Sequence, residues 1–191
     1  MQSPTKIIVS VEKQFNDEVT TDSGIKFYKD TTYKPEWNVV SHGKVEAIAR
    51  RVPKDFTVDG FYNTVEVGDT LYFHYLVVMD EDNRIDKNLY LVDYFQALAT
   101  VRDGKIYPVG EHILIEPLDA EVTHDFLVIP EMMKKKQTTK GRVFSSNDPS
   151  IPNGSIVEYE ELGKFENEIE GRKFFVMYNS NILVKHEERR S

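Results

Sequence analysis

Short apolar runs, separated by turns rich in glycine and aspartate, make up most of the hydrophobic pattern of this chain. Alternation of apolar and polar positions is typical of half-buried strands, and glycine or Asp-Gly pairs mark the turns between them. The sequence contains no long helical stripe of apolar residues. The pattern therefore predicts an all-β protein. The expected strands are Lys6–Val11, Gly43–Ile48, Gly68–Phe73, Leu89–Val92, Ala97–Val101, His112–Pro117, Gly141–Phe144, Gly154–Tyr159, Phe174–Met177 and Asn181–Val184.

The second half of the chain repeats the order of the first. Each half has an apolar strand, a long connection, an alternating strand led by glycine, a second strand led by glycine and two apolar strands. The differences in length are confined to connections, as two copies of one fold would show. A general likeness between any two all-β stretches is the alternative. We place the boundary at Asp103–Lys105, which predicts two tandem domains, 1–104 and 105–191.

Composition narrows the class of protein further. The chain has 191 residues, 40% of them apolar, and a net charge of −8, which fits a folded protein and argues against a nucleic-acid binder. The absence of cysteine excludes disulfides, thiolate catalysis and cysteine zinc sites. No apolar run is long enough for a membrane helix, and the start lacks the pattern of a signal peptide. We therefore expect a cytoplasmic protein without a membrane partner.

The sequence offers no constellation of residues for catalysis or for a cofactor. The segment Asp80–Asp86 has carboxylates at alternating positions but lacks the glycine and the distal glutamate of a calcium loop. The five histidines (42, 74, 112, 124 and 186) have no metal-ligand spacing. Phosphate-binding loops and nucleophile motifs are not found in the sequence. We expect no catalytic residue, no metal site, no cofactor and no enzymatic activity.

Aromatic residues lie beside basic ones in the segment 50–64. A small barrel can bind single-stranded nucleic acid through such a mixture. The acidity of the chain favours instead a packed loop or a contact within an oligomer. The residues concerned are Arg51, Lys54, Phe56, Phe61 and Tyr62.

The segment Phe126–Ile129 is the least typical of the chain. Four apolar residues in a row are followed by Pro130 and by three consecutive lysines, Lys134–Lys136. A half-buried strand would alternate instead. Two interpretations stay open: a core strand of the second domain, or an exposed apolar loop that binds a partner.

Three signatures resemble the co-chaperonin (GroES-like) family, whose rings cap a chaperonin. Gly43–Ile48 resembles the family's Gly-Glu-Val-x-Ala-Val strand, and Val65–Phe73 resembles its Val-x-Val-Gly-Asp-x-Val-x-Phe element, the most specific match. Leu127–Glu131 resembles the apolar patch of the family's mobile loop and lies between the expected strands His112–Pro117 and Gly141–Phe144. The resemblance covers nearly the whole chain as two tandem copies, an arrangement known among plastid co-chaperonins.

The resemblance implies two GroES-like, partly open β-barrels. It implies a mobile-loop-like segment at 124–140 in the second barrel and, in the first, a roof insertion at 50–64. The partner-binding residues would be Leu127, Val128, Ile129 and Pro130, with Ile25 and Phe27 at the corresponding place in the first barrel. The first patch departs from the family because Lys26 stands between its apolar residues. The second barrel has only Asn147–Pro152 where the family places a roof hairpin.

The implied function is that of a co-chaperonin. The chain would bind or cap a chaperonin ring, the partner would hydrolyse the ATP, and the chain would form a homo-oligomer, because several weak loops are needed for useful affinity. The alternative is a structural or interaction protein, for example a component of a virus particle, that reuses the barrel without binding a chaperonin.

Overall fold

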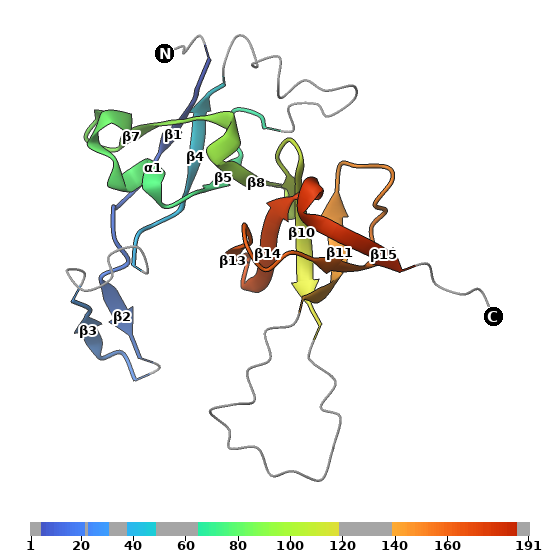
Figure 1. The fold of residues 1–191 in the computed structure, drawn as a ribbon. Helices are drawn as coiled ribbons and strands as arrows, with labels where there is room; N and C mark the ends of the chain where they lie inside the picture. Colours follow the sequence, from blue (N-terminus) through green and yellow to red (C-terminus); the bar gives the residue numbers. More distant parts are fainter. Residues whose placement is uncertain (1–4, 22, 31–37, 49–64, 119–138, 187–191) are drawn as a thin grey trace. The chain divides into compact units, whose positions relative to one another are not determined.

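The computed structural model describes residues 5–21, 23–30, 38–48, 65–118 and 139–186. The chain divides into two compact units, Met1–Gly110 (unit 1) and Glu111–Ser191 (unit 2) (Figure 1). Each unit is built around an antiparallel β-sheet, which confirms the all-β fold class with two β domains. The predicted roof insertion 50–64 lies outside the described residues, as does the mobile-loop-like segment 124–140 up to residue 138.

Unit 1 contains a seven-stranded sheet. Along the strand β4 (His42–Ala47), exposed and buried residues alternate, as the sequence pattern predicts. The inward side chains of β1, β4 and β5, among them Val9, Val45 and Leu71, form the core together with Val77 of the short helix α1 (Leu76–Met79). In sheet order the strands are β6 (Arg84–Asp86), β7 (Leu89–Val92), β1 (Ile7–Ser10), β4 (His42–Ala47), β5 (Thr70–Phe73), β8 (Ala97–Arg102) and β9 (Lys105–Pro108).

Three smaller elements complete unit 1. Two 3-10 helices, η3 (Glu81–Asn83) and η4 (Tyr94–Gln96), connect strands of the sheet. A separate two-stranded ladder, β2 (Glu18–Thr20) and β3 (Lys26–Tyr28), lies in the connection between β1 and β4. Among the helices of the described ranges, none has the length and apolar character needed to cross a bilayer.

Unit 2 contains a six-stranded sheet with its own core. Ile113, Ile115, Val143, Val157 and Met177 are buried there. In sheet order the strands are β13 (Phe165–Ile169), β14 (Arg172–Tyr178), β10 (His112–Pro117), β11 (Lys140–Ser146), β12 (Ile156–Tyr159) and β15 (Ile182–His186). The 3-10 helix η6 (Asn179–Asn181) joins β14 to β15, as η4 joins β7 to β8 in unit 1.

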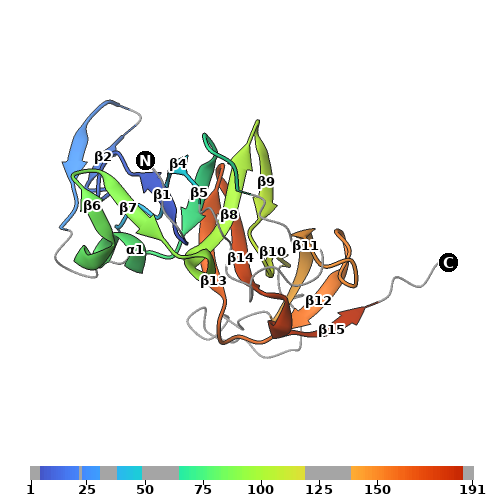
Figure 2. The same cartoon turned by 90° about the horizontal axis from the view of Figure 1, so that it is seen from above.

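The two sheets share one strand order. Unit 1 reads β6-β7-β1-β4-β5-β8, unit 2 reads β13-β14-β10-β11-β12-β15, and corresponding strands follow one another along the chain in the same sequence (Figures 1 and 2). The irregularities correspond as well. In unit 1 the pairing of β1 with β4 shifts in register between Ile8 and Val9. In unit 2 the pairing of β10 with β11 shifts in register between Leu114 and Ile115. The sheet of unit 1 differs by an added seventh strand, β9.

The strand β9 follows the turn at which the sequence places the domain boundary. Asp103 and Gly104 form this turn, both with positive φ. After the turn, β9 pairs with β8 in antiparallel register, Val101 opposite Ile106. Lys105–Pro108 therefore belongs to the sheet of unit 1, and unit 2 begins after Gly110.

Candidate functional site

The hairpin β2–β3 is the part of unit 1 that contains a predicted partner-binding patch. In its register Glu18 lies opposite Tyr28, Val19 opposite Phe27 and Thr20 opposite Lys26. The predicted residues Ile25 and Phe27 therefore belong to this hairpin and not to the seven-stranded sheet (Figure 1). We call residues 17–29 the β2–β3 hairpin.

Backbone hydrogen bonds join the two segments at the root of the hairpin to each other. The chain leaves β1 through Gln14–Asn16 and returns to β4 through Asn38–Val40, where Asn16 N–H donates to Asn38 O at 2.7 Å and Val40 N–H donates to Gln14 O at 3.0 Å. Phe15 bridges to Val39 and packs against the core. The root is thus anchored by both polar and apolar contacts, while the strands β2 and β3 lie beyond it.

The tip of the hairpin is a tight turn closed by Thr21. The Thr21 hydroxyl accepts a hydrogen bond from Ile25 N–H at 3.1 Å, and the Thr21 backbone N–H donates to Ile25 O at 2.9 Å. Gly24 adopts φ +80°, in the left-handed region that favours glycine. Polar turn chemistry from Thr21, Ser23 and Gly24 therefore determines how Ile25 enters β3.

The two faces of β3 carry different chemistry. Because side chains alternate along a strand, Ile25 and Phe27 lie on one face and Lys26 and Tyr28 on the other. Ile25 and Phe27 are each 56% exposed. On the opposite face the Lys26 ammonium pairs with the Glu18 carboxylate at 2.6 Å. The hairpin thus presents an apolar pair to solvent, with the lysine between them directed away from it.

Tyr28 is an exposed aromatic residue that the sequence patch did not include. It is 75% exposed and lies directly after Phe27. Its exposure could have been suspected from its position at the end of the run Ile25–Tyr28. Alternation along that run places Tyr28 on the same face as Lys26.

The second predicted patch, Leu127–Pro130, lies outside the described residues. The structure does describe where its segment leaves and rejoins unit 2. Leu118 N–H donates to Lys140 O at 3.3 Å, next to the ladder pair Pro117 and Gly141. The segment therefore starts and ends at two neighbouring strands, β10 and β11. The β2–β3 hairpin occupies the corresponding connection, between β1 and β4, in unit 1.

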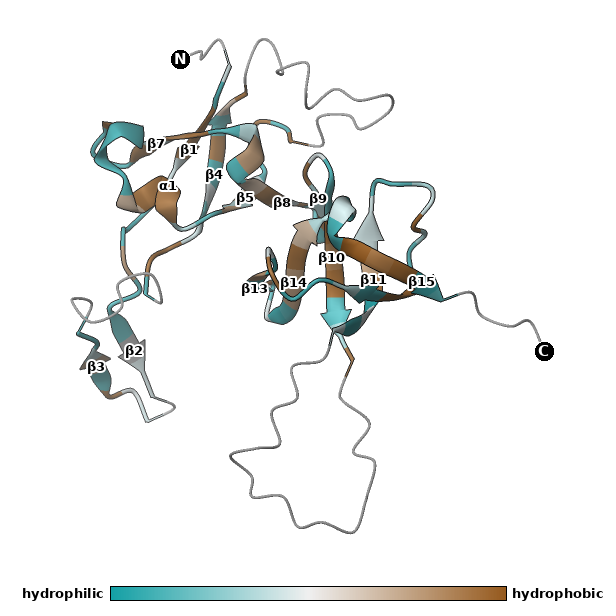
Figure 3. Ribbon diagram, in the orientation of Figure 1, coloured by the Kyte–Doolittle hydropathy of each residue, from teal (hydrophilic) through white to brown (hydrophobic). Residues whose placement is uncertain are grey.

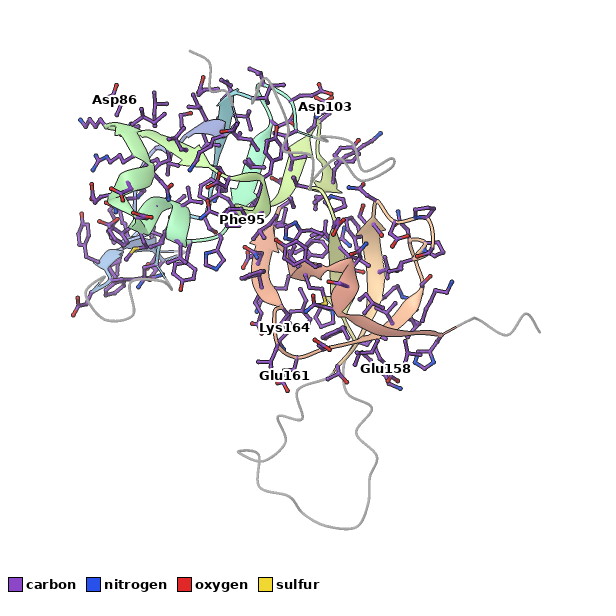
Figure 4. All side chains as sticks on the ribbon, turned by 45° about the horizontal axis from the view of Figure 1, so that its top comes forward. Asp86, Phe95, Asp103, Glu158, Glu161 and Lys164 are labelled. Atoms are coloured by element: carbon purple, nitrogen blue, oxygen red, sulfur yellow. The ribbon has the colours of Figure 1, made fainter. Side chains whose placement is uncertain are left out.

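Two carboxylates of the acidic segment Asp80–Asp86 accept local backbone hydrogen bonds. Asp80 Oδ1 accepts from Asp82 N–H at 3.0 Å and so caps η3, and Asp86 Oδ1 accepts from Lys87 N–H at 2.7 Å. Figure 4 shows Asp86 at the periphery of unit 1. Within the described ranges, no group of three or more His, Cys, Asp or Glu residues is arranged to hold a metal ion.

The histidines lie in separate environments. His42 stacks on Tyr72 with ring centroids 5.3 Å apart, and the buried His112 stacks on Tyr178 at 4.4 Å. Burial lowers the pKa of His74, and His186 Nε2 lies 3.0 Å from Glu158 Oε1. His124 lies outside the described residues. Each described histidine thus has its own neighbours within its unit.

Comparison with known proteins indicates a distant relationship and does not show a family. No protein-family model matches the chain. Among curated proteins, the chain is similar to co-chaperonin GroES 1 of Rhodopirellula baltica, with 25% identity over 99 residues. The alignment covers 98% of that protein and 46% of this chain, a share comparable to one of the two units. This similarity supports a distant relationship to GroES-like co-chaperonins.

Proposed function

We propose that the chain is a tandem, non-enzymatic co-chaperonin that binds a chaperonin ring through exposed apolar patches. Both units would be GroES-like barrels derived from one repeated domain. The shared strand order and the similarity to a co-chaperonin support this proposal. The partner would hydrolyse ATP in the cytoplasm, and the chain would act as a homo-oligomer without a cofactor of its own.

The observation that carries the proposal is the apolar face of the β2–β3 hairpin. Ile25 and Phe27 are more than half exposed on a hairpin whose root is anchored in the core. Exposed apolar side chains that lie together are typical of contact sites. The patch lies in the same connection of the barrel as Leu127–Pro130 does in unit 2. Each chain would therefore present two patches of the same kind.

The energetics favour weak and reversible contact. Burying one such side chain stabilises a complex by about 1.5–3 kcal/mol, and ordering a flexible loop costs about 1–2 kcal/mol per residue. The hydrogen bonds of the β2–β3 hairpin reduce that cost, because the strand is already formed before it binds. Useful affinity then comes from several patches presented together by an oligomer.

The experiment is a pull-down of the full chain by a chaperonin from the same source, with and without ATP. Phe27→Asp and Val128→Asp should each weaken nucleotide-dependent binding, because a carboxylate in either patch opposes burial. The double variant should abolish binding. Leu162→Asp is the matched control, because Leu162 is 83% exposed but lies outside both patches, and it should bind like the natural chain.

Each outcome of this pull-down separates the two functions considered. Loss of binding in the double variant but not in the control supports the co-chaperonin. Failure of the folded natural chain to bind in any nucleotide state overturns it. That result would favour the alternative of a structural or interaction protein that uses the same barrel.

A further inference from the structure

A polar cavity lies in unit 1 where the chain leaves β1. Its volume is about 390 Å³, which is in the range of small-molecule sites. All of its lining residues belong to unit 1, and neither Ile25 nor Phe27 is among them. The polar side chains used below are those of Ser10, Glu12, Lys13, Asn16, Lys44 and Thr70.

One wall of the cavity is a row of three side chains across neighbouring strands. Ser10 of β1 lies opposite Lys44 of β4, and Lys44 lies opposite Thr70 of β5. Residues directly opposite each other in a ladder project to the same face. Their neighbours along the strands, such as Val9 and Val45, are buried in the core. Hydrophilic positions thus alternate with hydrophobic ones along β4 (Figure 3), and the row faces away from the core.

A second wall comes from the segment that follows β1. Glu12, Lys13 and Asn16 belong to this segment. Asn16 N–H donates to Asn38 O at 2.7 Å, which holds the far end of the segment in place. Both walls are therefore formed before a ligand binds, which reduces the entropy lost on binding.

Two lysines supply the positive charge of the cavity. Among the described residues, the Lys44 ammonium has no ion-pair partner. Lys13 Nζ lies 3.8 Å from Asp17 Oδ1, but both side chains are at least half exposed. Solvent weakens such a pair, so that the Lys13 ammonium is available to an anion in the cavity.

Two hydrogen-bond acceptors lie beside these cations. Ser10 Oγ donates to Glu46 Oε1 at 2.6 Å, so its lone pairs remain to accept from a ligand. The Glu12 carboxylate also accepts and does not donate. A simple anion would leave both acceptors without donors and would be repelled by Glu12. A ligand that carries hydroxyl groups as well as an anionic group complements both kinds of lining residue.

The corresponding row of unit 2 has different chemistry. The register shows the corresponding residues to be Glu116, Arg142 and Ile156. Glu116 forms an ion pair with Arg172, and Arg142 Nη1 donates to Gly154 O at 3.2 Å. Ile156 has an aliphatic side chain where unit 1 has a hydroxyl. The combination of two hydroxyls with an unpaired ammonium is therefore particular to unit 1.

We propose that this cavity binds a small phosphate-bearing polyol, such as a sugar phosphate. The phosphate lies between the Lys13 and Lys44 ammoniums, because two cations complement a group that carries nearly two negative charges at neutral pH. The ligand hydroxyls donate to Ser10 Oγ and to the Glu12 carboxylate. This binding site goes beyond the proposed function and does not depend on it.

The test is a titration of the full chain without chaperonin, followed by the chemical shifts of backbone amides. Ribose 5-phosphate, inorganic phosphate and ribose are separate probes. Amides of β1, β4 and residues 12–16 should shift and saturate with ribose 5-phosphate. This probe should bind at least about tenfold more tightly than either inorganic phosphate or ribose, because only it uses both the cations and the acceptors.

Two substitutions should weaken this binding in different ways. Lys44→Gln removes a cation and should weaken binding of ribose 5-phosphate at least about tenfold. Thr70→Ile introduces the residue that unit 2 has at this position, and its larger side chain should weaken binding by a similar factor. Lys87→Gln is the matched control, because Lys87 is an exposed lysine of the same unit that does not line the cavity. It should bind like the natural chain.

The same spectra show whether each variant is folded, and Ser10→Glu, which also introduces the unit 2 residue, replaces Thr70→Ile if the latter unfolds. Absence of saturable binding to the folded natural chain overturns the proposal. So does equal affinity for inorganic phosphate and ribose 5-phosphate, or unchanged affinity in both cavity variants. Phe27→Asp should bind ribose 5-phosphate normally, so failure of this site and failure of the chaperonin contact are distinguished.

Discussion

The two units form the same turn before corresponding strands but stabilise it with different side chains. The turn before β5 and the turn before β12 each have a glycine in the left-handed region, Gly68 and Gly154. Three backbone hydrogen bonds close each turn, and they correspond one to one. In unit 1 they run from Val45 N–H to Asp69 O (2.8 Å), from Gly68 N–H to Val45 O (2.8 Å) and from Asp69 N–H to Glu66 O (3.2 Å). In unit 2 they run from Val143 N–H to Ser155 O (2.9 Å), from Gly154 N–H to Val143 O (2.7 Å) and from Ser155 N–H to Pro152 O (3.2 Å).

The side chains then diverge at one position. Where unit 2 has Ser155, unit 1 has Asp69, which is 4% exposed. Its carboxylate accepts from Arg102 Nε and Nη2, both at 2.8 Å, from Thr100 Oγ1 at 3.0 Å and from Glu66 N–H at 2.8 Å. These bonds join β5, β8 and the turn. Backbone geometry is therefore common to the two units, whereas the chemistry that secures it is particular to each.

The strongest way to break this comparison is Asp69→Ala. Removing the carboxylate leaves the Arg102 guanidinium and the Thr100 hydroxyl without their buried partner, which should lower the free energy of unfolding of unit 1 by about 3 kcal/mol. Ser155→Ala keeps the backbone bonds of the turn and should cost less than about 0.5 kcal/mol. Hydrogen exchange resolved by strand measures both. Equal losses in the two units would contradict the assignment of the ion pair as the difference.

Replacing the glycine at the start of β4 or of β11 tests the shared backbone instead. A Cβ on Gly43 would lie 2.5 Å from Ser10 O, and one on Gly141 would lie 2.8 Å from Glu116 O and against Ile115. Gly43→Ala and Gly141→Ala should each destabilise their own unit by about 2 kcal/mol. Urea denaturation followed with hydrogen exchange checks this. If one substitution proves harmless, the two positions are not equivalent in packing.

Acid should affect the two units through different carboxylates. Burial opposes ionisation of Asp69, but hydrogen bonds from Arg102, Glu66 N–H and Thr100, with the Arg102 charge, outweigh it and lower its pKa below the ordinary 3.8. The unfolded chain therefore binds this proton more readily than the folded chain. The stabilisation is present at neutral pH and is lost as the pH falls below about 4.

Asp148 of unit 2 provides the comparison for this pH dependence. A hydrogen bond from Ser150, opposed by burial and aided by Asn179, lowers the pKa of its carboxyl. Both units should therefore lose stability in acid. Asp69→Asn should flatten the acid-dependent loss in unit 1 and leave that of unit 2 unchanged, as thermal unfolding between pH 3 and 7 would reveal. An unaltered profile for unit 1 would show that other carboxylates control it.

The smallest effect is expected in the β2–β3 hairpin. Lys26→Ala removes the ion pair with Glu18, in which the lysine side chain is 60% exposed. Exposed pairs contribute about 0.5 kcal/mol or less, so the melting temperature should hardly change. Amides of β2 and β3 should exchange slightly faster. We infer from the contacts at the root that the core of unit 1 holds the hairpin in place. A large fall in melting temperature would contradict this, because it would mean that the hairpin stabilises unit 1.

Sequence patterns predicted the strands that carry the cores and the edge strand β15, but not the other edge strands of the two sheets. Apolar alternation and glycine-led turns sufficed for β4, β5, β11 and β12, because one face of each is buried. Three strands of the sheets were missed, β6, β9 and β13. The segment Lys105–Pro108 ends in proline, and Phe165–Ile169 is largely acidic and polar. Edge strands are defined by a neighbouring ladder more than by their own composition, and a single sequence does not reveal that neighbour.

The residues of the candidate site could be predicted from the sequence, but the hairpin that presents them could not. Ile25 and Phe27 were identified from a resemblance to a loop patch, and their role in binding stays a prediction. The turn closed by Thr21 and Gly24 depends on hydroxyl and backbone geometry, which residue types alone do not determine. The ion pair of the buried Asp69 with Arg102 was likewise not predictable, because the two residues lie far apart in the sequence and meet only across β5 and β8.

The strand β9 determines where the chain can be divided into separately expressed halves. The sequence analysis places the domain boundary in the turn Asp103–Gly104. A cut there would separate β9 from β8 and leave β9 as an unpaired N-terminal segment of the second fragment. In the first fragment the outer edge of β8 would be exposed to solvent, which favours aggregation. A cut after Gly110 keeps the hairpin intact, together with Val109, whose N–H donates to Leu98 O at 3.1 Å. Recombinant halves should therefore end and begin there.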